Sequence, residues 1–293
     1  MPRVTVEQLV AVQAHFGHLT SKWNPRMKPY IFTKRNGIHI IDLMKTSDMI
    51  DRACEAVLQI VAAGDQVLFV GTKKQAKELV KEQAIRCNSP YVCERWLGGT
   101  LTNLQTIRKS VKTMQLIEKQ KIDGTYEKIT KKERLFKDTQ LDKLLNALGG
   151  IRDMRKLPGA LFVVDIRNEE IAVAEATRLG IPVIGIVDTN SDPTSVKYPI
   201  PANDDAFKSI WLIMQAIANA VIEGQAVYAE RNQGREQEIA EASANEEKQH
   251  REPRERGDRG ERGGGGGGDR PRGPRRRDRG TPAEKPSGAA TTE

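Results

Sequence analysis

The hydrophobic pattern of the chain is clearest between residues 161 and 188, where two short apolar runs enclose an amphipathic segment. Leu161–Val164 and Val183–Val187 are apolar runs rich in β-branched residues, and an aspartate follows each. Such runs are typical of strands that are buried on both faces. The segment 169–179 has apolar residues at helical spacing and precedes Gly180, a residue type that commonly ends helices. A strand, a helix and a second strand predict a βαβ unit and a parallel sheet.

Similar elements are expected on both sides of this unit. Short apolar runs predict strands near residues 38–43, 66–71 and 91–93, with an edge strand at 198–201. Helical spacing predicts helices near residues 46–63, 72–86 and 204–223, and Gly224 is expected to end the last of them. Together these elements predict a fold of the α/β class. In open parallel sheets, functional groups lie at the carboxyl ends of the strands, which here carry Asp165 and Asp188.

Residues 101–150 have a different pattern, in which apolar side chains recur every three or four positions. The first stripe contains Leu101, Leu104, Ile107, Val111, Met114 and Ile117, and the second contains Leu135, Leu141, Leu145 and Leu148. A narrow stripe is typical of a coiled-coil seam. Asp123–Thr125 separates the two stripes, and Thr100 or Thr102 is expected to cap the first helix. We therefore predict an antiparallel coiled-coil hairpin inserted into the α/β domain.

Composition indicates a negatively charged partner and sets the C-terminal segment apart from the rest of the chain. The chain of 293 residues has 47 Lys and Arg against 39 Asp and Glu, a formal net charge of +8, which suits a polyanionic partner. Apolar residues almost vanish from about Arg231, so we expect a disordered Arg/Gly-rich tail. The three cysteines have no C-x-x-C spacing and fit reduced cytosolic thiols. No continuous apolar run reaches the ~18 residues of a membrane helix, so no membrane segment is expected.

The segment 15–37 combines cations with aromatic rings. Two prolines and two glycines argue against a regular element there. Basic residues alternate with Trp23, Tyr30 and Phe32. Because cations bind phosphates and planar rings stack on unpaired bases, this composition indicates RNA. The alternative is an irregular loop that packs on the domain through its aromatic rings while its lysines stay solvated.

Two strand-end features are candidate sites for small ligands. Gly71–Lys74 follows a strand and opens a helix, which could seat a phosphate, but it lacks the P-loop spacing, and the chain has no G-x-G-x-x-G motif. Asp165, Asp188 and Asp192 have no nucleophile or base beside them in the sequence, and the segment after Asp188 has the composition of a tight turn. The alternative function is therefore an α/β enzyme, or a sugar-phosphate or nucleotide-binding protein, that uses these loops.

Metal and cofactor chemistry is not expected. His15 and His18 are three residues apart, but the segment around them has no cysteine and no nearby acid. A zinc site needs such additional ligands. We assign no catalytic residue, no metal ligand, no cofactor and no small-molecule substrate.

Several long motifs in this chain resemble those of one family, the bacterial-type ribosomal small-subunit protein two. They are His15–His18, Trp23–Ile31, Asn36–Leu43, Arg95–Asn103, Leu157–Asp165, Gly180–Pro193 and Asn203–Ala206. The resemblance spans about residues 5–226, and the order of the motifs makes it specific. Val12–Ala14 and Glu94 differ from the commonest family forms, and the Arg/Gly-rich tail is not general in the family.

The resemblance implies a Rossmann-like parallel sheet with helices on both faces and a protruding helical hairpin. It also implies a structural, non-enzymatic role in translation, on small-subunit ribosomal RNA near the head–body junction of a cytoplasmic ribosome. Other small-subunit proteins are expected as neighbours, including the large messenger-binding protein one.

These inferences divide the chain and select its candidate contacts. We expect a first part of the α/β domain at 1–100, the hairpin at 101–150, a second part at 151–226 and the tail at 227–293. The candidate RNA-binding residues are Lys22, Trp23, Arg26, Lys28, Lys34, Arg35, Lys73, Lys74, Arg95, Arg108, Lys109 and Lys112.

Overall fold

The computed structural model describes residues 2–124, 126 and 129–251, with side-chain burial up to residue 233. The chain divides into two compact units, Met1–Glu241 and Ala242–Glu293. The first unit holds the elements described below. In the second, the described residues are those at the end of the last helix, which reaches Arg251.

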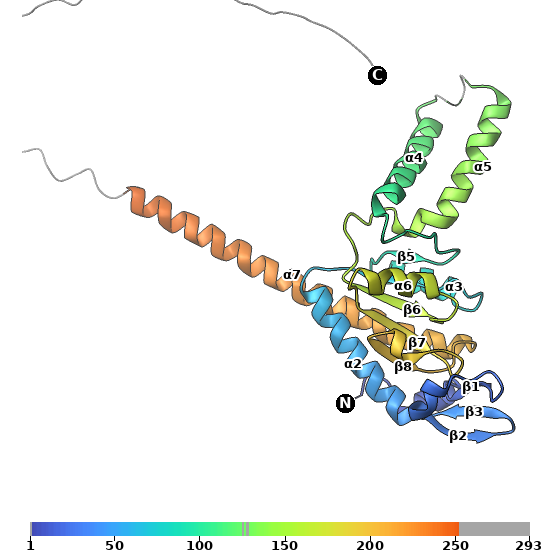
Figure 1. Ribbon diagram of the computed structural model, residues 1–293. Coiled ribbons are helices and arrows are strands. Elements are labelled where there is room, and N and C mark those ends of the chain that lie inside the picture. The colour runs from blue at the N-terminus through green and yellow to red at the C-terminus, as the bar shows by residue number, and fades with distance from the viewer. Residues whose placement is uncertain (1, 125, 127–128, 252–293) are drawn as a thin grey trace, which may run out of the picture. The chain divides into compact units, whose positions relative to one another are not determined.

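A five-stranded parallel sheet forms the centre of the first unit (Figure 1). Its strands are β4 (Val67–Val70), β5 (Tyr91–Val92), β6 (Ala160–Val164), β7 (Val183–Val187) and β8 (Tyr198–Pro201), in the order β5-β4-β6-β7-β8. Every residue of β4, β6 and β7 is buried. This burial on both faces is why these strands are continuous apolar runs rather than alternating ones. The predicted parallel sheet is confirmed.

Helices cover both faces of this sheet, as predicted. One core cluster joins Phe69, Phe162 and Ile184 to α2 (Leu43–Ala62), α3 (Lys77–Arg86) and α7 (Phe207–Arg251). The other cluster joins Leu68, Val70, Leu161 and Val163 to α6 (Glu170–Arg178) and to the helical hairpin. Because successive side chains of a strand point to opposite faces, the two clusters take alternate residues of the same strands.

The N-terminal segment differs from the expected irregular loop, since it forms a small antiparallel sheet. After α1 (Val6–Ala11), the strands β1 (Phe16–Leu19), β2 (Ile31–Arg35) and β3 (Ile38–Ile41) pair in the order β1-β3-β2. Asn36 and Gly37 both have positive φ, 51° and 74°, and connect β2 to β3. Asn-Gly is the sequence of a tight hairpin turn, a signal that the proline and glycine count obscured. Both prolines lie in the 3-10 helix η1 (Pro25–Tyr30).

The inserted hairpin consists of α4 (Leu104–Ile122) and α5 (Lys131–Leu148), and η3 (Gly149–Ile151) leads back to the sheet. The hairpin is inserted between β5 and β6 and protrudes from the sheet (Figure 1). The first predicted stripe is confirmed, because Ile107, Val111, Met114 and Ile117 are buried. The second is only half correct, since Leu141 and Leu148 are buried whereas Leu135 and Leu145 are 69% and 37% exposed.

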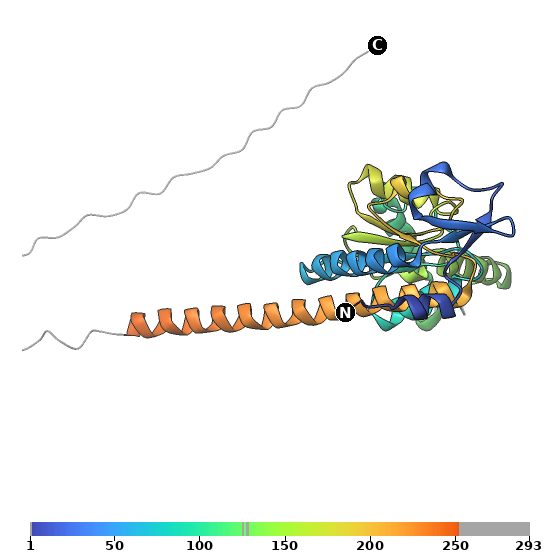
Figure 2. The same ribbon diagram turned by 90° about the horizontal axis from the view of Figure 1, so that it is seen from below.

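The last helix does not end at Gly224 but continues to Arg251. In Figure 2, α7 runs beside α2. At Gly224, a Cβ atom would sit 2.8 Å from Val61 Cβ and 3.0 Å from the Leu58 carbonyl oxygen of α2. The glycine is therefore needed for a close helix crossing and not for a helix end. The predicted tail starts inside this helix, and its part beyond Arg251 lies outside the described residues.

Within α7, the segment Phe207–Gln233 is long and apolar enough to cross a membrane by length and composition alone. Half of its most apolar window is buried inside the protein. A helix that contributes Ile210, Met214 and Ile217 to the main core passes the same test, so we interpret it as a core helix.

Replacing Gly224 with alanine is expected to destabilise the protein by about 1–3 kcal/mol, because the added methyl group overpacks the crossing with α2. The gain in helix propensity, about 1 kcal/mol, offsets only part of this cost. Urea unfolding measures the difference. Gly98→Ala is the control, because a Cβ atom at Gly98 meets nothing within 4 Å. Equal stability of Gly224→Ala and wild type would contradict the close-packing interpretation.

Candidate nucleic-acid interface and the carboxyl edge of the sheet

Lys73 lies where the strand order reverses, between the ends of β4 and β6, the usual ligand position in an open α/β sheet. Its Nζ atom is 2.7 Å from Asp204 Oδ1, 2.6 Å from Asp205 Oδ1 and 3.4 Å from Asp165 Oδ2. Burial by itself would lower the pKa of Lys73, but these carboxylates raise it overall. The ammonium group is thus held by the protein itself and is not directed at a phosphate.

The neighbouring turn is also occupied by a side chain of the protein. Glu169 Oε1 accepts hydrogen bonds from the Thr72 backbone N–H at 3.0 Å and from the Thr72 hydroxyl at 2.5 Å. Asn168 Nδ2 donates to Thr72 Oγ1 at 2.8 Å. Since a carboxylate already lies on the turn that could have seated a phosphate, this geometry argues against the nucleotide-binding alternative.

A group of potential metal ligands lies beside this network. His18 Nδ1 is 3.0 Å from Asp188 Oδ2, and ligand atoms of His18, Asp188 and Asp204 all lie within 4.8 Å of one another. Burial, followed by the charges of Asp188 and Asp165, raises the pKa of Asp204 to about 7. An imidazole and two carboxylates have the donor chemistry to hold a divalent cation. The acids that the sequence lacks near His18 are supplied by distant segments. His15 is not part of this group, and its ring lies 4.1 Å from that of Phe16 between centroids, tilted by 39°.

Five of the eleven predicted RNA-binding cations lie in the N-terminal segment 15–37. Lys22, Lys28, Lys34 and Arg35 are exposed, and they make no ion pair within the described part of the chain. Arg26 is exposed but is ion-paired with Asp192. Trp23 is half-buried, and its ring centroid lies 5.0 Å from that of His39. Tyr30 is half-buried and Phe32 is 74% exposed, so the aromatic residues only partly anchor this segment.

The hairpin carries the second group of predicted contacts. Arg108, Lys109 and Lys112 are exposed on α4, whose buried side holds Ile107 and Val111. Nearby cations are different, because Lys121 pairs with Asp138 at 2.7 Å and Arg152 pairs with Glu118 at 3.0 Å. Lys74 and Arg95 are also exposed. Among the described residues, none of the five predicted cations Lys74, Arg95, Arg108, Lys109 and Lys112 forms an ion pair.

Glu175 organises the turn that leads into the hairpin, a role that the sequence analysis did not predict. Its Oε1 atom accepts from Trp96 Nε1 at 3.0 Å and from Gly99 N at 2.7 Å. Its Oε2 atom accepts from Leu101 N at 3.0 Å and from the Thr102 N and hydroxyl, both at 3.1 Å. The expected threonine cap of α4 is therefore wrong, because this carboxylate binds the free N–H groups of the turn and Asn103 takes the N-cap position without a side-chain bond.

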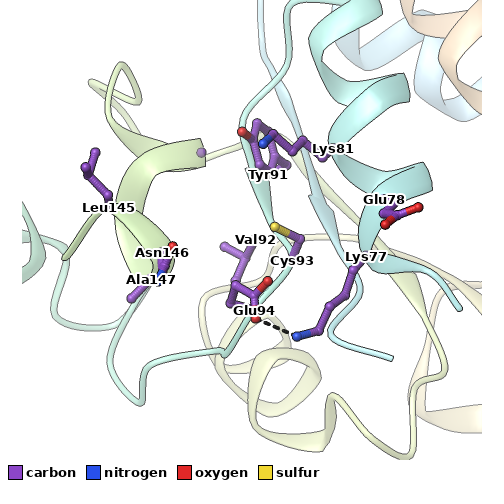
Figure 3. Close-up of a pocket in the computed structure, with 11 residues that line it drawn as sticks. Lys77, Glu78, Lys81, Tyr91, Val92, Cys93, Glu94, Leu145, Asn146 and Ala147 are labelled. Atoms are coloured by element: carbon purple, nitrogen blue, oxygen red, sulfur yellow. Dashed lines mark hydrogen bonds and ion pairs between the residues drawn. The ribbon is translucent and has the colours of Figure 1, made fainter. Parts of the chain in front are cut away.

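A pocket of about 240 Å³ lies between α3, β5 and the end of α5 (Figure 3). Lys77 Nζ lies 2.5 Å from Glu94 Oε2 at its rim, and the half-buried Cys93 is close to this pair (Figure 3). Burial, followed by the Glu94 charge, raises the pKa of the Cys93 thiol. A thiol with a raised pKa is a poor nucleophile at neutral pH, so Cys93 is not activated for covalent catalysis.

The fold and its polar sites define a class of protein. The ligand position of the α/β sheet is filled by an internal Lys–Asp network. Exposed cations such as Lys34 and Arg108, which form no ion pair among the described residues, lie on the N-terminal sheet and the hairpin. This is the arrangement of a basic α/β binding scaffold rather than of a nucleotide-dependent enzyme.

Comparison with known proteins identifies the family. The sequence matches the family described as Ribosomal protein S2 over residues 9–224. It is 52% identical to the small ribosomal subunit protein uS2 of Chlorobaculum tepidum, covering 80% of this chain and 97% of the relative. It is 57% identical to the uS2 protein of Bacteroides fragilis, covering 76% of this chain and 81% of the relative.

The chain therefore belongs to the ribosomal protein S2 family and is a structural ribosomal protein rather than an enzyme. The resemblance found in the sequence motifs is confirmed. The individual RNA-binding residues stay predictions.

Proposed function

We propose that this chain is built into the small ribosomal subunit of a cytoplasmic ribosome and contacts small-subunit ribosomal RNA through two surfaces. The loop surface consists of Lys22, Lys28, Lys34 and Arg35, and the hairpin surface consists of Arg108, Lys109 and Lys112. The observation that carries the proposal is that these exposed cations have no ion-pair partner among the described residues. Phosphate groups are the natural counter-ions for such surfaces.

The loop surface is positioned by a regular element. Four of the five residues of β2, including Lys34 and Arg35, are exposed. The small sheet is fixed to the carboxyl edge of the large sheet, since the Thr189 hydroxyl accepts from His18 N at 2.8 Å and the Thr189 carbonyl accepts from Asn24 N at 2.7 Å. Because the small sheet is rigidly attached, its cations can bind phosphates without a large loss of conformational entropy.

The remaining candidates are revised by their surroundings. Arg26 forms an ion pair with Asp192, so its main role is structural. Only the exposed part of its side chain could contact RNA. Lys73 is removed from the proposed surface because three carboxylates surround it. Lys74 and Arg95 stay as candidates because both are exposed.

Protein neighbours and the parts of the chain complete the proposal. Other small-subunit proteins, including the large messenger-binding protein one, are its proposed neighbours, as in the family. We retain the division into an α/β domain at 1–100 and 151–226, a hairpin arm at 101–150 and an extension from 227. The extension is rich in arginine and is proposed to add salt-sensitive RNA affinity.

The loop surface can be tested by salt-dependent binding of the full chain to small-subunit ribosomal RNA. Changing Lys22, Lys28, Lys34 and Arg35 together to glutamine is expected to lower the affinity at least about tenfold. The slope of log affinity against log salt should fall by roughly three, because about 0.7–0.9 counterions are released per phosphate contact.

The control for this test carries the same charge change on other surfaces. Arg52, Lys81, Arg155 and Arg178 are exposed and form no ion pair in the described part of the chain. Their change to glutamine is expected to alter the slope of log affinity against log salt by less than about 0.9, the value for one phosphate contact. An equal reduction in both variants would show that net charge, and not the loop surface, drives binding.

A further inference from the structure

The small N-terminal sheet contains a pocket that the proposed cation contacts do not explain. This base pocket has an open volume of about 520 Å³ and is lined by Thr20, Trp23, Lys34, Asn36, Gly37 and His39. Lys34 pairs with His39 across β2 and β3, so both side chains lie on the same face of the sheet. The volume falls within the range of pockets that bind small ligands.

His39 is the buried polar group in this pocket. Its side chain is only 8% exposed, and neither ring nitrogen has a hydrogen-bond partner within the described residues. Burial, followed by the charge of Lys34, lowers the pKa of His39, which favours the neutral imidazole. A neutral imidazole offers one donor and one acceptor. Buried polar groups are almost always hydrogen-bonded, so two unpartnered nitrogens in a residue that lines the pocket indicate a missing ligand.

Trp23 forms the aromatic wall of the same pocket. Its ring is tilted by 43° to that of His39 with the centroids 5.0 Å apart, so the two rings are not stacked face to face. The indole is half-buried, which fixes its orientation while part of the ring stays available to a ligand. The rim is formed by the Asn36–Gly37 turn, and a Cβ atom at Gly37 would meet nothing within 4 Å.

We propose that the base pocket receives one unpaired RNA base, which stacks on Trp23 and is hydrogen-bonded at its edge by His39. Lys34, beside them on the same face, meets the phosphate of that nucleotide. Aromatic stacking combined with edge hydrogen bonds is how proteins hold unstacked bases, and a cation at the rim suits the adjoining phosphate. This inference rests on the proposed RNA contact of the loop surface and assigns a base-binding role within it.

Binding of a short single-stranded, uridine-rich RNA that carries one 2-aminopurine tests the pocket in the full chain. Stacking on Trp23 is expected to quench the 2-aminopurine fluorescence. Trp23→Leu should remove this quenching and lower the affinity about tenfold, since base–aromatic stacking is worth that much or more. The salt slope should not change, because no phosphate contact is lost. Lys34→Gln should instead reduce the slope by about 0.7.

Matched variants separate stacking from loss of structure. Trp211→Leu removes a tryptophan of α7, outside the pocket, and should behave like wild type. Trp23→Phe keeps an aromatic wall and should retain most of the affinity, whereas His39→Leu should lose affinity that His39→Gln partly recovers. If Trp23→Leu does not fold, ultraviolet crosslinking of wild-type protein decides the matter, with crosslinks expected in the peptide that contains Trp23.

Each outcome bears on a different part of the proposal. Wild-type affinity and quenching in a folded Trp23→Leu variant, or crosslinks confined to other peptides, would overturn the base pocket and leave the RNA contact of the loop surface intact. A pocket that is occupied by a side chain of a neighbouring protein, and not by a base, would also leave affinity and quenching unchanged in Trp23→Leu. If wild-type protein does not bind RNA in a salt-dependent way, the proposed RNA contact fails and the base pocket fails with it.

Discussion

Replacing Glu175 with glutamine is expected to destabilise the protein by about 3 kcal/mol, although the two side chains have nearly the same shape. The carboxylate of Glu175 accepts hydrogen bonds on both oxygens from the turn at residues 96–102. An amide replaces one of these acceptors with a donor, so buried N–H groups lose their partner. Hydrogen bonds to a charged group contribute about 1.5–3 kcal/mol each, and an unsatisfied buried donor costs about 1–3 kcal/mol.

The same contact predicts a dependence on pH. Burial alone would raise the pKa of Glu175, but hydrogen bonds from Thr102, Trp96, Gly99 and Leu101 lower it overall. A pKa that is lower in the folded state gives stability that is present above the unfolded-state value, near 4.3. That stability is lost as the pH falls below about 4 and passes through the folded-state pKa. The Glu175→Gln variant should therefore differ most from wild type at neutral pH and least in acid.

Urea unfolding at neutral and acidic pH measures both effects. Glu170→Gln is the control, because Glu170 is exposed on the same helix and its substitution leaves the turn intact. If Glu175→Gln and Glu170→Gln are equally stable at neutral pH, the carboxylate does not hold the turn.

Replacing Lys73 with methionine is expected to cost about 3–5 kcal/mol, the effect of removing one partner from a buried ion pair. Asp204 is fully buried and has Lys73 Nζ at 2.7 Å. Without that ammonium group its carboxylate faces the carboxylates of Asp165 and Asp188, so a buried charge is left without its counter-ion. Methionine preserves the apolar stem, which limits any additional packing loss.

Two further variants make this result specific. Lys74→Met changes the adjacent, exposed lysine and should alter stability by less than about 0.5 kcal/mol. Adding Asp204→Asn to Lys73→Met should recover a large part of the lost stability, because the unpaired charge is then gone. Thermal and urea unfolding measure all three proteins. No recovery in the double variant would mean that Lys73 acts through packing and not through its charge.

The sheet was predictable because strands that are buried on both faces must be continuous apolar runs, which are visible in the sequence. Leu161–Val164 and Val183–Val187 had to be apolar at every position, and they form β6 and β7 in parallel register. The ends of the last helix were not predictable in the same way. Gly224 has the usual chemistry of a helix end, yet its role depends on Val61 of α2, and no local pattern contains that contact.

The polar sites were hidden for the same reason. Lys73 was a candidate phosphate ligand because it follows a strand, but its carboxylate partners, such as Asp204, lie 131 residues away. Glu175 has the spacing of an ordinary amphipathic helix, and only the fold brings it to the turn at Gly99. The exposure of surface cations such as Lys34 and Arg108 could be predicted from the sequence, because it does not depend on a contact with a distant residue.

The attachment of the small sheet to the carboxyl edge also has a consequence for folding during synthesis. His18 needs Thr189, 171 residues later, and the amide of Asn203 donates to the carbonyl of Gln13, 190 residues earlier. At about 5–20 residues per second, Thr189 is made roughly 10–30 s after His18. During that delay Leu9 and Ala14, which end in the main core, have only an incomplete core to enter. The segment that is translated first therefore reaches its final contacts late, and its exposed apolar residues favour aggregation of the nascent chain or binding of chaperones.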